Sequence, residues 1–402
     1  MEQRTTKSMI GAISESEILQ SIRAEIREGV EKILEEEVAA ALGALKSERS
    51  EERRGYRNGA FERTVTTERG EETLRVPRAR VREEDGTTSE WRSEMLPAYQ
   101  RRTQRVDEAI LGIYLAGANT RRIRKALAPL LGASNLSKSA ISRVVARLKA
   151  LFEAWRSRDL SQETYLILFL DALFLSVRIA RRVVSVPVQI ALGIREDGQK
   201  VVLGMQVALT ESTSDWTEMV RSLGERGLAD PLLVVMDGAP GLRAAVKTAW
   251  STSLVQRCTE HKYRNLKKKV PMHAHEELRR DYRAITHALS PENGLRAYDA
   301  FLAKWSKLCP EAAKSLQEAG LELLTFFRFP RSLWRALRTT NGLERLNEEF
   351  RRRVKTQGAM PNETSALTLL YGLIAFGQIR LKKIGGFRAV ATMREVVAEK
   401  VA

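Results

Sequence analysis

The chain has 402 residues, and its 67 lysines and arginines against 50 aspartates and glutamates give a net charge of +17. This length allows two or three domains with a sizeable core, and the charge favours a polyanionic partner such as DNA or RNA. Only two cysteines are present, Cys258 and Cys309, which excludes a disulfide framework. The sequence shows neither an apolar signal segment nor an apolar run of about 18 residues, so we expect a soluble intracellular protein without a membrane span.

Residues 14–47 are predicted to form an amphipathic helix. Apolar residues recur at three-to-four spacing between Ile18 and Leu34, while glutamates between Glu25 and Glu37 make the polar face acidic. An acidic face disfavours DNA binding. We therefore expect this helix to pack on another element or to self-associate.

Residues 53–82 are basic and lack helical periodicity. Polar and apolar residues alternate at 64–66 and 73–76, which predicts a small β-element edged with arginines, and a solvated linker is the alternative. The candidate DNA-binding residues of this segment are Arg54, Arg57, Arg78 and Arg80.

Residues 104–154 return to a helical pattern and predict three helices, with turns at Gly117 and Gly132. Asn119 with Thr120 caps the second helix and Ser137 caps the third. The third helix is basic and carries small polar residues outward, as in a helix-turn-helix DNA reader, and a three-helix bundle without DNA is the alternative. Its candidate DNA contacts are Lys138, Ser139, Ser142 and Arg143.

The middle of the chain alternates strands with helices. Strands are predicted at 165–180 (continuous, or broken after Asp171), 186–194, 200–208, 232–236 and 253–257, and helices at 216–226 and 242–250. Three consecutive strands, then helix, strand, helix and strand, is the order of a ribonuclease-H-like core. In that fold the first and fourth strands are adjacent, so Asp171 and Asp237 are expected side by side.

Three carboxylates have settings that favour a catalytic site. Asp171 follows the apolar run 165–170, Asp237 ends the run 232–236, and Glu344 begins a basic helical stretch. Carboxylates that converge in a basic protein suggest Mg²⁺ held against a nucleic-acid phosphate. Glu348, one helical turn after Glu344, and its neighbour Glu349 are rivals that spacing alone does not exclude. Further candidate DNA-binding residues follow in the same stretch: Arg345, Arg351, Arg352 and Arg353.

Glu344 follows Asp237 by 107 positions, which exceeds what such a core needs. The helical periodicity of the intervening residues predicts an all-helical insertion whose last helix contains Leu316, Leu323 and Phe327, although Gly320 within it weakens that helix. A final apolar helix is predicted at 367–379, packed on the core or on a partner subunit.

Cys258 and His261 form a Cys-x-x-His pair just past the last predicted strand. Zinc needs four ligands, and His273 with His275 could complete a site, although their spacing matches no standard finger. His261 could instead hydrogen-bond a phosphate or a catalytic acid. Cys309 is expected in the core of the helical insertion.

Several short motifs, taken in order, make the chain resemble the transposases of bacterial insertion sequences of the Mutator type. The resemblance covers residues 50 to 385 and becomes specific through the order and spacing of its parts. The motifs are Arg-Gly-Tyr-Arg-Asn-Gly at 54–59, Val-Pro-Arg-Ala-Arg at 76–80, Leu-Asp-Ala at 170–172, Val-Met-Asp-Gly at 235–238, Gln-Arg-Cys-Thr-Glu-His at 256–261, and Thr-Thr-Asn-Gly-Leu-Glu-Arg-Leu-Asn at 339–347 with three arginines at 351–353.

The resemblance implies a DDE-type transposase whose triad is Asp171, Asp237 and Glu344. These acids are expected to hold two Mg²⁺ ions, with Mn²⁺ able to substitute, and Cys258 and His261 to be site-associated and not zinc-binding. It further implies a homodimer that binds terminal inverted repeats and target DNA. Strand cleavage and transfer are expected by a copy-out, paste-in route with a circular intermediate, in a bacterial cytoplasm at the nucleoid.

The expected fold class is α/β, with a ribonuclease-H-like core, an all-helical insertion and helical DNA-binding domains that include a helix-turn-helix. Two other functions stay open: a DNA-binding regulator without catalysis, and a nuclease that cuts without joining. The predicted segments are an N-terminal helical segment at 1–52, a basic β-containing segment at 53–98, the helix-turn-helix domain at 99–158, the core at 159–262 and 332–385, the insertion at 263–331 and a tail at 386–402.

Overall fold

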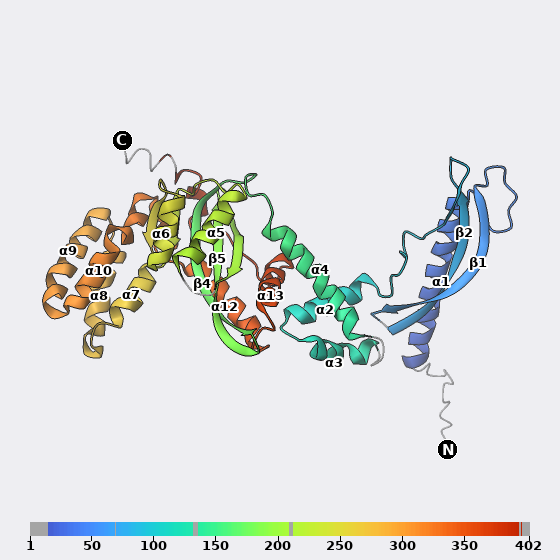
Figure 1. Ribbon diagram of the computed structural model, residues 1–402, viewed down its shortest axis with the longest axis horizontal. Coiled ribbons are helices and arrows are strands. Elements are labelled where there is room, and N and C mark those ends of the chain that lie inside the picture. Colours follow the sequence, from blue (N-terminus) through green and yellow to red (C-terminus); the bar gives the residue numbers. More distant parts are fainter. Residues whose placement is uncertain (1–14, 69, 132–135, 209–211, 394, 396–402) are drawn as a thin grey trace, which may run out of the picture. The chain divides into compact units, whose positions relative to one another are not determined.

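The computed structural model describes residues 15–68, 70–131, 136–208, 212–393 and 395 (Figure 1). The chain forms two compact units, one containing residues up to Tyr114 with Asn119–Val144, the other Leu115–Ala118 with the chain from Val145 onward. Each unit contains one β-sheet and several helices, so the protein has the mixed α/β fold expected. In the described part of the chain, no helix is both long and apolar enough to cross a membrane.

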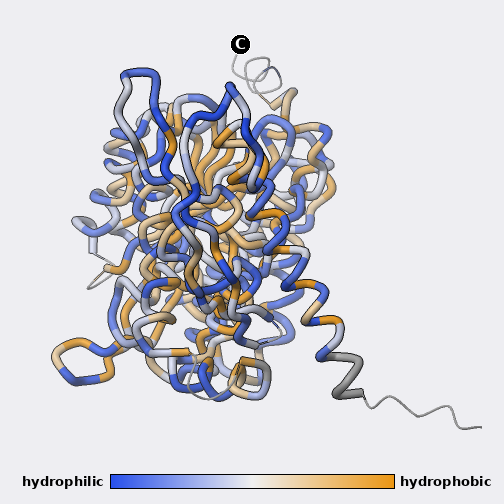
Figure 2. The backbone as a smooth tube through the Cα atoms, turned by 90° about the vertical axis from the view of Figure 1, so that its right-hand side faces the viewer, coloured by the Kyte–Doolittle hydropathy of each residue, from blue (hydrophilic) through white to orange (hydrophobic). Residues whose placement is uncertain are grey.

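The first unit begins with a helix packed on an antiparallel sheet. Helix α1 covers Glu15–Leu42, and the sheet has the order β1 (Gly55–Thr67), β2 (Gly70–Arg82) and β3 (Thr88–Glu90). Hydrophobic and hydrophilic residues alternate along α1 (Figure 2), and its apolar side chains pack on the sheet. The buried residues of this contact are Leu34, Val38, Leu42, Val65, Leu74, Val76 and Ala79. The predicted β-element is thus confirmed, and the alternative of a solvated linker is wrong. Helix α1 is a packing helix.

The acidic face of α1 also binds the sheet. Glu35 forms a 2.5 Å ion pair with Arg57, and Glu31 accepts the backbone N–H of Arg75 at 2.8 Å. The glutamates therefore align the helix on the sheet. Arg57 therefore has a carboxylate partner within the unit, and its contact with DNA stays a prediction.

Three helices follow: α2 (Gln104–Leu115), α3 (Thr120–Leu131) and α4 (Lys138–Arg156). Asn119 Oδ1 accepts the N–H of Arg122, and Ser137 Oγ accepts that of Ala140, both at 3.1 Å, so both predicted caps are confirmed. The turn predicted at Gly117 has a positive φ of 93°, and the one at Gly132 lies outside the described residues.

A five-stranded sheet in the order β6-β5-β4-β7-β8 forms the centre of the second unit. The strands are β4 (Tyr165–Ile179), β5 (Arg182–Arg195), β6 (Lys200–Val207), β7 (Leu233–Met236) and β8 (Leu254–Arg257). Strands β4, β5 and β6 are antiparallel, while β7 and β8 run parallel to β4. The strands that come first and fourth along the chain, β4 and β7, are therefore adjacent in the sheet, as predicted. Strand β4 continues through Asp171, which decides against a break there.

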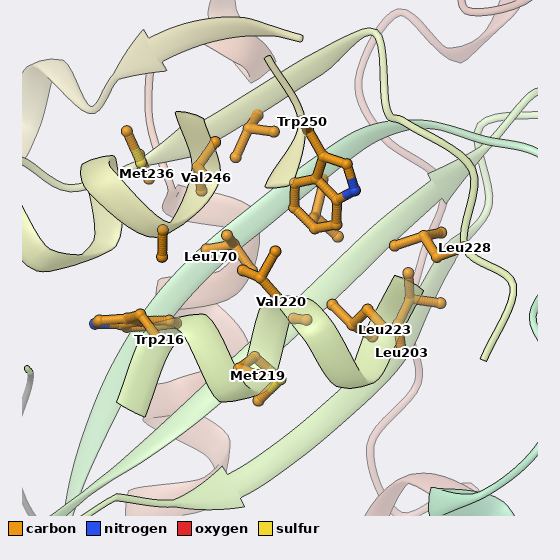
Figure 3. Close-up of a cluster of buried hydrophobic side chains, with 14 of the residues drawn as sticks. Leu170, Leu203, Trp216, Met219, Val220, Leu223, Leu228, Met236, Val246 and Trp250 are labelled. Atoms are coloured by element: carbon orange, nitrogen blue, oxygen red, sulfur yellow. The ribbon is translucent and has the colours of Figure 1, made fainter. Parts of the chain in front are cut away.

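One face of this sheet is covered by α5 (Thr213–Glu225) and α6 (Pro240–Ala249). Figure 3 shows Trp216, Met219 and Val220 of α5 in one cluster of buried side chains with Leu170 and Leu203 of the sheet. Because side chains alternate along a strand, burying Leu168 and Leu170 here directs Phe169 and Asp171 to the opposite face. This alternation decides which face of the sheet can carry a site.

The opposite face is covered by α12 (Asn341–Lys355) and α13 (Glu363–Ala375). Helix α13 packs on the unit's own core, where a Cβ on Gly372 would meet the side chain of Leu148. Its predicted C-terminal end at residue 379 is wrong. The helix stops at Ala375 because the chain turns at Gly377, whose φ is +67°.

Helices at one end of the second unit form a core of their own (Figure 1). They are α7 (Thr259–Lys267), α8 (His275–Thr286), α9 (Pro291–Leu308) and α10 (Pro310–Ala319). The predicted helix through Leu316 and Phe327 is wrong in one respect: α10 ends at Ala319, because Gly320 has a φ of +57°. A short helix at Met272–Ala274 separates α7 from α8. After α10 the chain returns to the sheet through short helices at Gly320–Leu323, Thr325–Arg328, Arg331–Leu333 and Trp334–Leu337, and another short helix follows later at Phe387–Ala389.

Candidate active site

The two aspartates lie just past the end of the parallel pairing between two neighbouring strands. Leu170 of β4 is in register with Met236 of β7; Asp171 is the next residue within β4, which continues to Ile179, and Asp237 directly follows the end of β7. Asp171 and Asp237 are therefore side by side at one edge of the sheet, as the strand order predicted. The carboxyl edge of a parallel pair is where such folds place their sites.

Asp171 is buried, with 8% of its surface exposed, and both of its oxygens accept hydrogen bonds. Oδ1 accepts the N–H of Ala172 at 3.0 Å, and Oδ2 accepts Nδ2 of Asn347 at 3.2 Å. Burial raises the pKa of Asp171 to about 6; His261 opposes this rise, while the charges of Asp237 and Glu344 add to it. The three predicted acids are therefore close enough to act on one another electrostatically.

Asp237 is half-buried and shapes the turn that leads into α6. Its Oδ1 accepts the N–H of Ala239 at 2.9 Å. The next residue, Gly238, lies against the Arg257 guanidinium, and a Cβ there would come within 1.9 Å of that group. Any larger residue at 238 would displace the Arg257 guanidinium, so the packing of Arg257 favours glycine after Asp237.

Glu344 lies in the first turn of α12, where Oε1 is 3.1 Å from Nη1 of Arg264 and 3.7 Å from Nε2 of His261. Its two sequence rivals have other environments. Glu348 is exposed, and Glu349 pairs with Arg352 at 2.5 Å. Among the three, Glu344 is the one whose charge raises the pKa of Asp171.

Cys258 and His261 lie together at the start of α7. The buried Cys258 Sγ accepts both the N–H and the hydroxyl of Thr340, at 3.4 Å each, which ties this turn to the start of α12. Hydrogen bonding to Cys258 raises the pKa of His261 to about 9; burial opposes the rise, while the charges of Asp171 and Asp237 add to it. The carboxylates of Asp171 and Asp237 therefore favour the protonated form of this imidazole.

The alternative zinc site is not assembled by these residues. Nε2 of His275 contacts the backbone carbonyls of Lys267 and Val270, at 3.1 and 2.9 Å, and His273 is exposed. The Sγ of Cys309 donates to the Lys269 carbonyl at 3.4 Å while the residue packs, half-buried, against the helical core, as expected.

The donor set suits a hard divalent cation. Asn347 Oδ1 is buried without a hydrogen-bond partner, Glu344 Oε1 is buried with Arg264 as its ion-pair partner, and a cation would offset the effect of Asp237 and Glu344 on Asp171. Within the described residues, no three His, Cys, Asp or Glu side chains converge closely enough to hold a metal ion. Glu344 faces Arg264 and His261, so it would have to rotate to join the aspartates.

The candidate DNA-binding residues are spread over both units. Arg54, Arg78 and Arg80 are exposed around the first sheet, with Arg78 over the ring of Phe61 at 4.7 Å. The α4 candidates are exposed too: Lys138, Ser139, Ser142 and Arg143.

On α12 the candidates differ in exposure. Arg345 and Arg351 are exposed, Arg352 pairs with Glu349, and Arg353 is half-buried. The DNA-binding roles of these residues therefore stay predictions.

Two residues in this region were missed by sequence reasoning. Asn347 is three residues after Glu344, so the i, i+3 helical spacing was an available signal. Arg264 is likewise three residues after His261 and reaches Glu344. This spacing alone does not distinguish a site residue from an ordinary polar residue, because the distinction depends on how α7 and α12 pack against the sheet.

Comparison with known proteins adds an independent result. Residues 1–378 match the family model described as "Transposase, Mutator family". The chain belongs to the Mutator family of transposases. The resemblance found in the sequence motifs is thereby confirmed.

The relatives of this Mutator-family chain include several insertion-sequence transposases. The transposase for insertion sequence element IS406 of Burkholderia multivorans is 37% identical, covering 84% of this chain and 86% of the relative. That for ISRM5 of Rhizobium meliloti is 35% identical, over 88% and 86%. That for IS256 in transposon Tn4001 of Staphylococcus aureus is 32% identical, over 84% and 85%.

Proposed function

We propose that this Mutator-family chain is a DDE-type DNA transposase with a ribonuclease-H-like core. One observation carries the proposal: Asp171 and Asp237 directly follow Leu170 and Met236, the last pair in register between the parallel strands β4 and β7, and the charge of Glu344 acts on Asp171. The sheet order β6-β5-β4-β7-β8, with three antiparallel strands and two parallel ones, supports the ribonuclease-H-like assignment.

Asp171, Asp237 and Glu344 would hold two Mg²⁺ ions, with Mn²⁺ able to substitute. Bound there, the ions supply an activated oxygen nucleophile and stabilise the leaving oxygen at the phosphate. Asn347 fixes the rotamer of Asp171 through its hydrogen bond. Arg264, and His261 in its protonated form, would contribute positive charge beside Glu344, where a DNA phosphate would lie.

The basic surfaces of both units would bind terminal inverted repeats and target DNA. The net charge of +17 and the exposed cations around β2 and on α4, a proposed helix-turn-helix element, support this assignment. A homodimer acting at the bacterial nucleoid, and a copy-out, paste-in route through a circular intermediate, complete the proposal. These last features rest on the family.

The test combines purified protein, Mg²⁺ and DNA that carries the ends flanking its own gene. We expect nicked and joined products from the wild type and from Asp299→Asn, a change at an exposed acid on α9 that controls for loss of charge. Asp237→Asn should give neither product. Products from Asp237→Asn at the wild-type rate would contradict the metal-site assignment.

Two other results would each select one of the competing functions. Cleavage without joined products would favour a nuclease. Sequence-specific binding without any product would favour a regulator.

A further inference from the structure

A cavity of about 520 Å³ in the second unit contains a cluster of cations. We call it the basic cavity; its charged lining residues are Lys200, Glu260, Arg335, Arg338 and Arg345. Four positive side chains therefore face a single carboxylate. Ligand cavities commonly measure roughly 300–1,000 Å³, so this one has room for a nucleotide.

The basic cavity adjoins the candidate active site. Phe169, which lines it, lies two residues before Asp171 on β4 and therefore on the same face of the sheet. Gly342 and Arg345 of its wall flank Glu344 on α12, and Glu260 precedes His261. The cavity and the carboxylates thus share three structural elements, so one DNA strand could contact both.

The positive charge of this cavity is poorly compensated. Among the described residues, Lys200, Arg335 and Arg345 have no carboxylate at ion-pair distance. Arg338 is held by other groups: its guanidinium donates to the Thr286 carbonyl at 3.1 Å and contacts His287 Nε2 at 3.0 Å. The uncompensated cations make the cavity a place where an anion would be stabilised.

Lys200 shows this imbalance in detail. Its ammonium is so close to the first turn of α12 that a Cβ on Gly342 would lie 3.2 Å from Nζ. Burial lowers the pKa of Lys200, and the positive charge of Arg345 lowers it further. Two cations therefore repel each other beside a helix N-terminus, which itself favours negative charge.

We infer that the basic cavity binds a backbone phosphate, with its nucleotide, of the DNA strand that reaches the carboxylates. Lys200 and Arg345 would contact the phosphate, and the size of the cavity would admit the attached nucleotide. The inference rests on the proposed function, because the ligand is taken to be the strand that this site processes.

The first experiment replaces individual phosphates of the end DNA, one position at a time, by uncharged methylphosphonates. Binding is measured by fluorescence anisotropy without divalent metal, so that no cleavage is needed. We expect one position near the cleavage site to weaken wild-type binding about tenfold, as the loss of a charge-assisted hydrogen bond would. In Lys200→Ala, the same methylphosphonate should have little further effect.

The control is Lys307→Ala, which removes an exposed lysine on α9, far from the basic cavity along the chain. It should keep the wild-type interference pattern. If Lys200→Ala also keeps that pattern at every position, the inference is overturned. Because removing Lys200 relieves its repulsion with Arg345, the variant should fold, and its melting temperature checks this.

A second measurement separates this inference from the proposed function. A 5′-phosphorylated oligothymidine of four nucleotides should raise the Tm of the wild type and of Lys307→Ala, but not of Lys200→Ala with Arg345→Ala. Equal shifts in all proteins would overturn the inference even if cleavage is confirmed. If the oligothymidine raises the Tm selectively in this way but the wild type neither binds nor cuts end DNA, phosphate binding in the basic cavity is supported and the proposed function is contradicted.

Discussion

Asn347 donates a 3.2 Å hydrogen bond to Asp171, and both side chains are buried. The donor lies on the same helix as Glu344, three residues later, so α12 brings in one acid and orients another. An amide can do this without adding charge to a place where carboxylates already repel one another. The placement of α12 on the sheet therefore determines the geometry of the whole acidic site.

Asn347→Ala should impair metal-dependent cleavage more than DNA binding. Loss of a partner that orients a metal ligand commonly costs about 10–100-fold in activity or metal affinity. We expect Mg²⁺ titrations of cleavage to shift to higher concentrations, while anisotropy with end DNA stays at the wild-type value. An unchanged Mg²⁺ dependence would show that Asp171 keeps its orientation without Asn347.

Divalent metal should stabilise the wild-type protein against heat. The buried Asp171 is destabilised by Asp237 and Glu344, and a bound cation offsets that repulsion while binding the folded state selectively. At about 100 times its Kd, one bound ion adds about 2.7 kcal/mol. Calorimetric Tm values with and without Mn²⁺ test this, and Asp171→Asn should lose most of the shift. Equal shifts in both proteins would place the ion elsewhere.

Glu318→Gln should destabilise the junction between the sheet and the helical insertion. Glu318 of α10 pairs with Arg257 at 3.1 Å and with Lys262 at 2.6 Å, and both cations are buried. Leaving them without a carboxylate should cost about 1–3 kcal/mol in unfolding free energy, measured with urea.

The matched change for this junction is Glu322→Gln. Glu322 pairs with the more exposed Arg243 and Lys247, so its loss should cost less than about 1 kcal/mol. Equal losses from the two substitutions would mean that Arg257 and Lys262 find other partners.

Cys258→Ala should loosen the start of α12. Thr340 is fully buried, and both its N–H and its hydroxyl donate to the Cys258 sulfur. We expect a loss of about 1–3 kcal/mol in unfolding free energy, together with reduced cleavage, because Glu344 lies in the turn that follows. Cys309→Ala, at a half-buried thiol with a single carbonyl contact, should change both quantities little. Comparable effects from the two substitutions would remove the special role of Cys258.

Much of the second unit could be predicted from local sequence. The apolar run at 165–170 predicts a buried strand, and the order of strands and helices predicts that Asp171 lies beside Asp237, as the register of β4 with β7 confirms. These predictions succeed because a central strand that is buried on both faces consists of consecutive apolar residues, which the sequence shows directly. Errors came where one residue changes the backbone, as at Gly320 and Gly377, whose positive φ ends a helix.

The sequence by itself determined the strand order, the pairing of the two aspartates and, through its motifs, the family. The family motifs favoured Glu344 over Glu348, and the tertiary structure gave the physical reason: the packing of α12 on the sheet places its first turn, with Glu344, beside His261 and Arg264, and leaves Glu348 exposed. Tertiary structure alone decided that Arg57 binds Glu35 and that Lys200 meets Arg345 in a cavity. Such contacts join residues far apart in the chain, and no local pattern of hydrophobicity or charge specifies which distant side chain will be the partner.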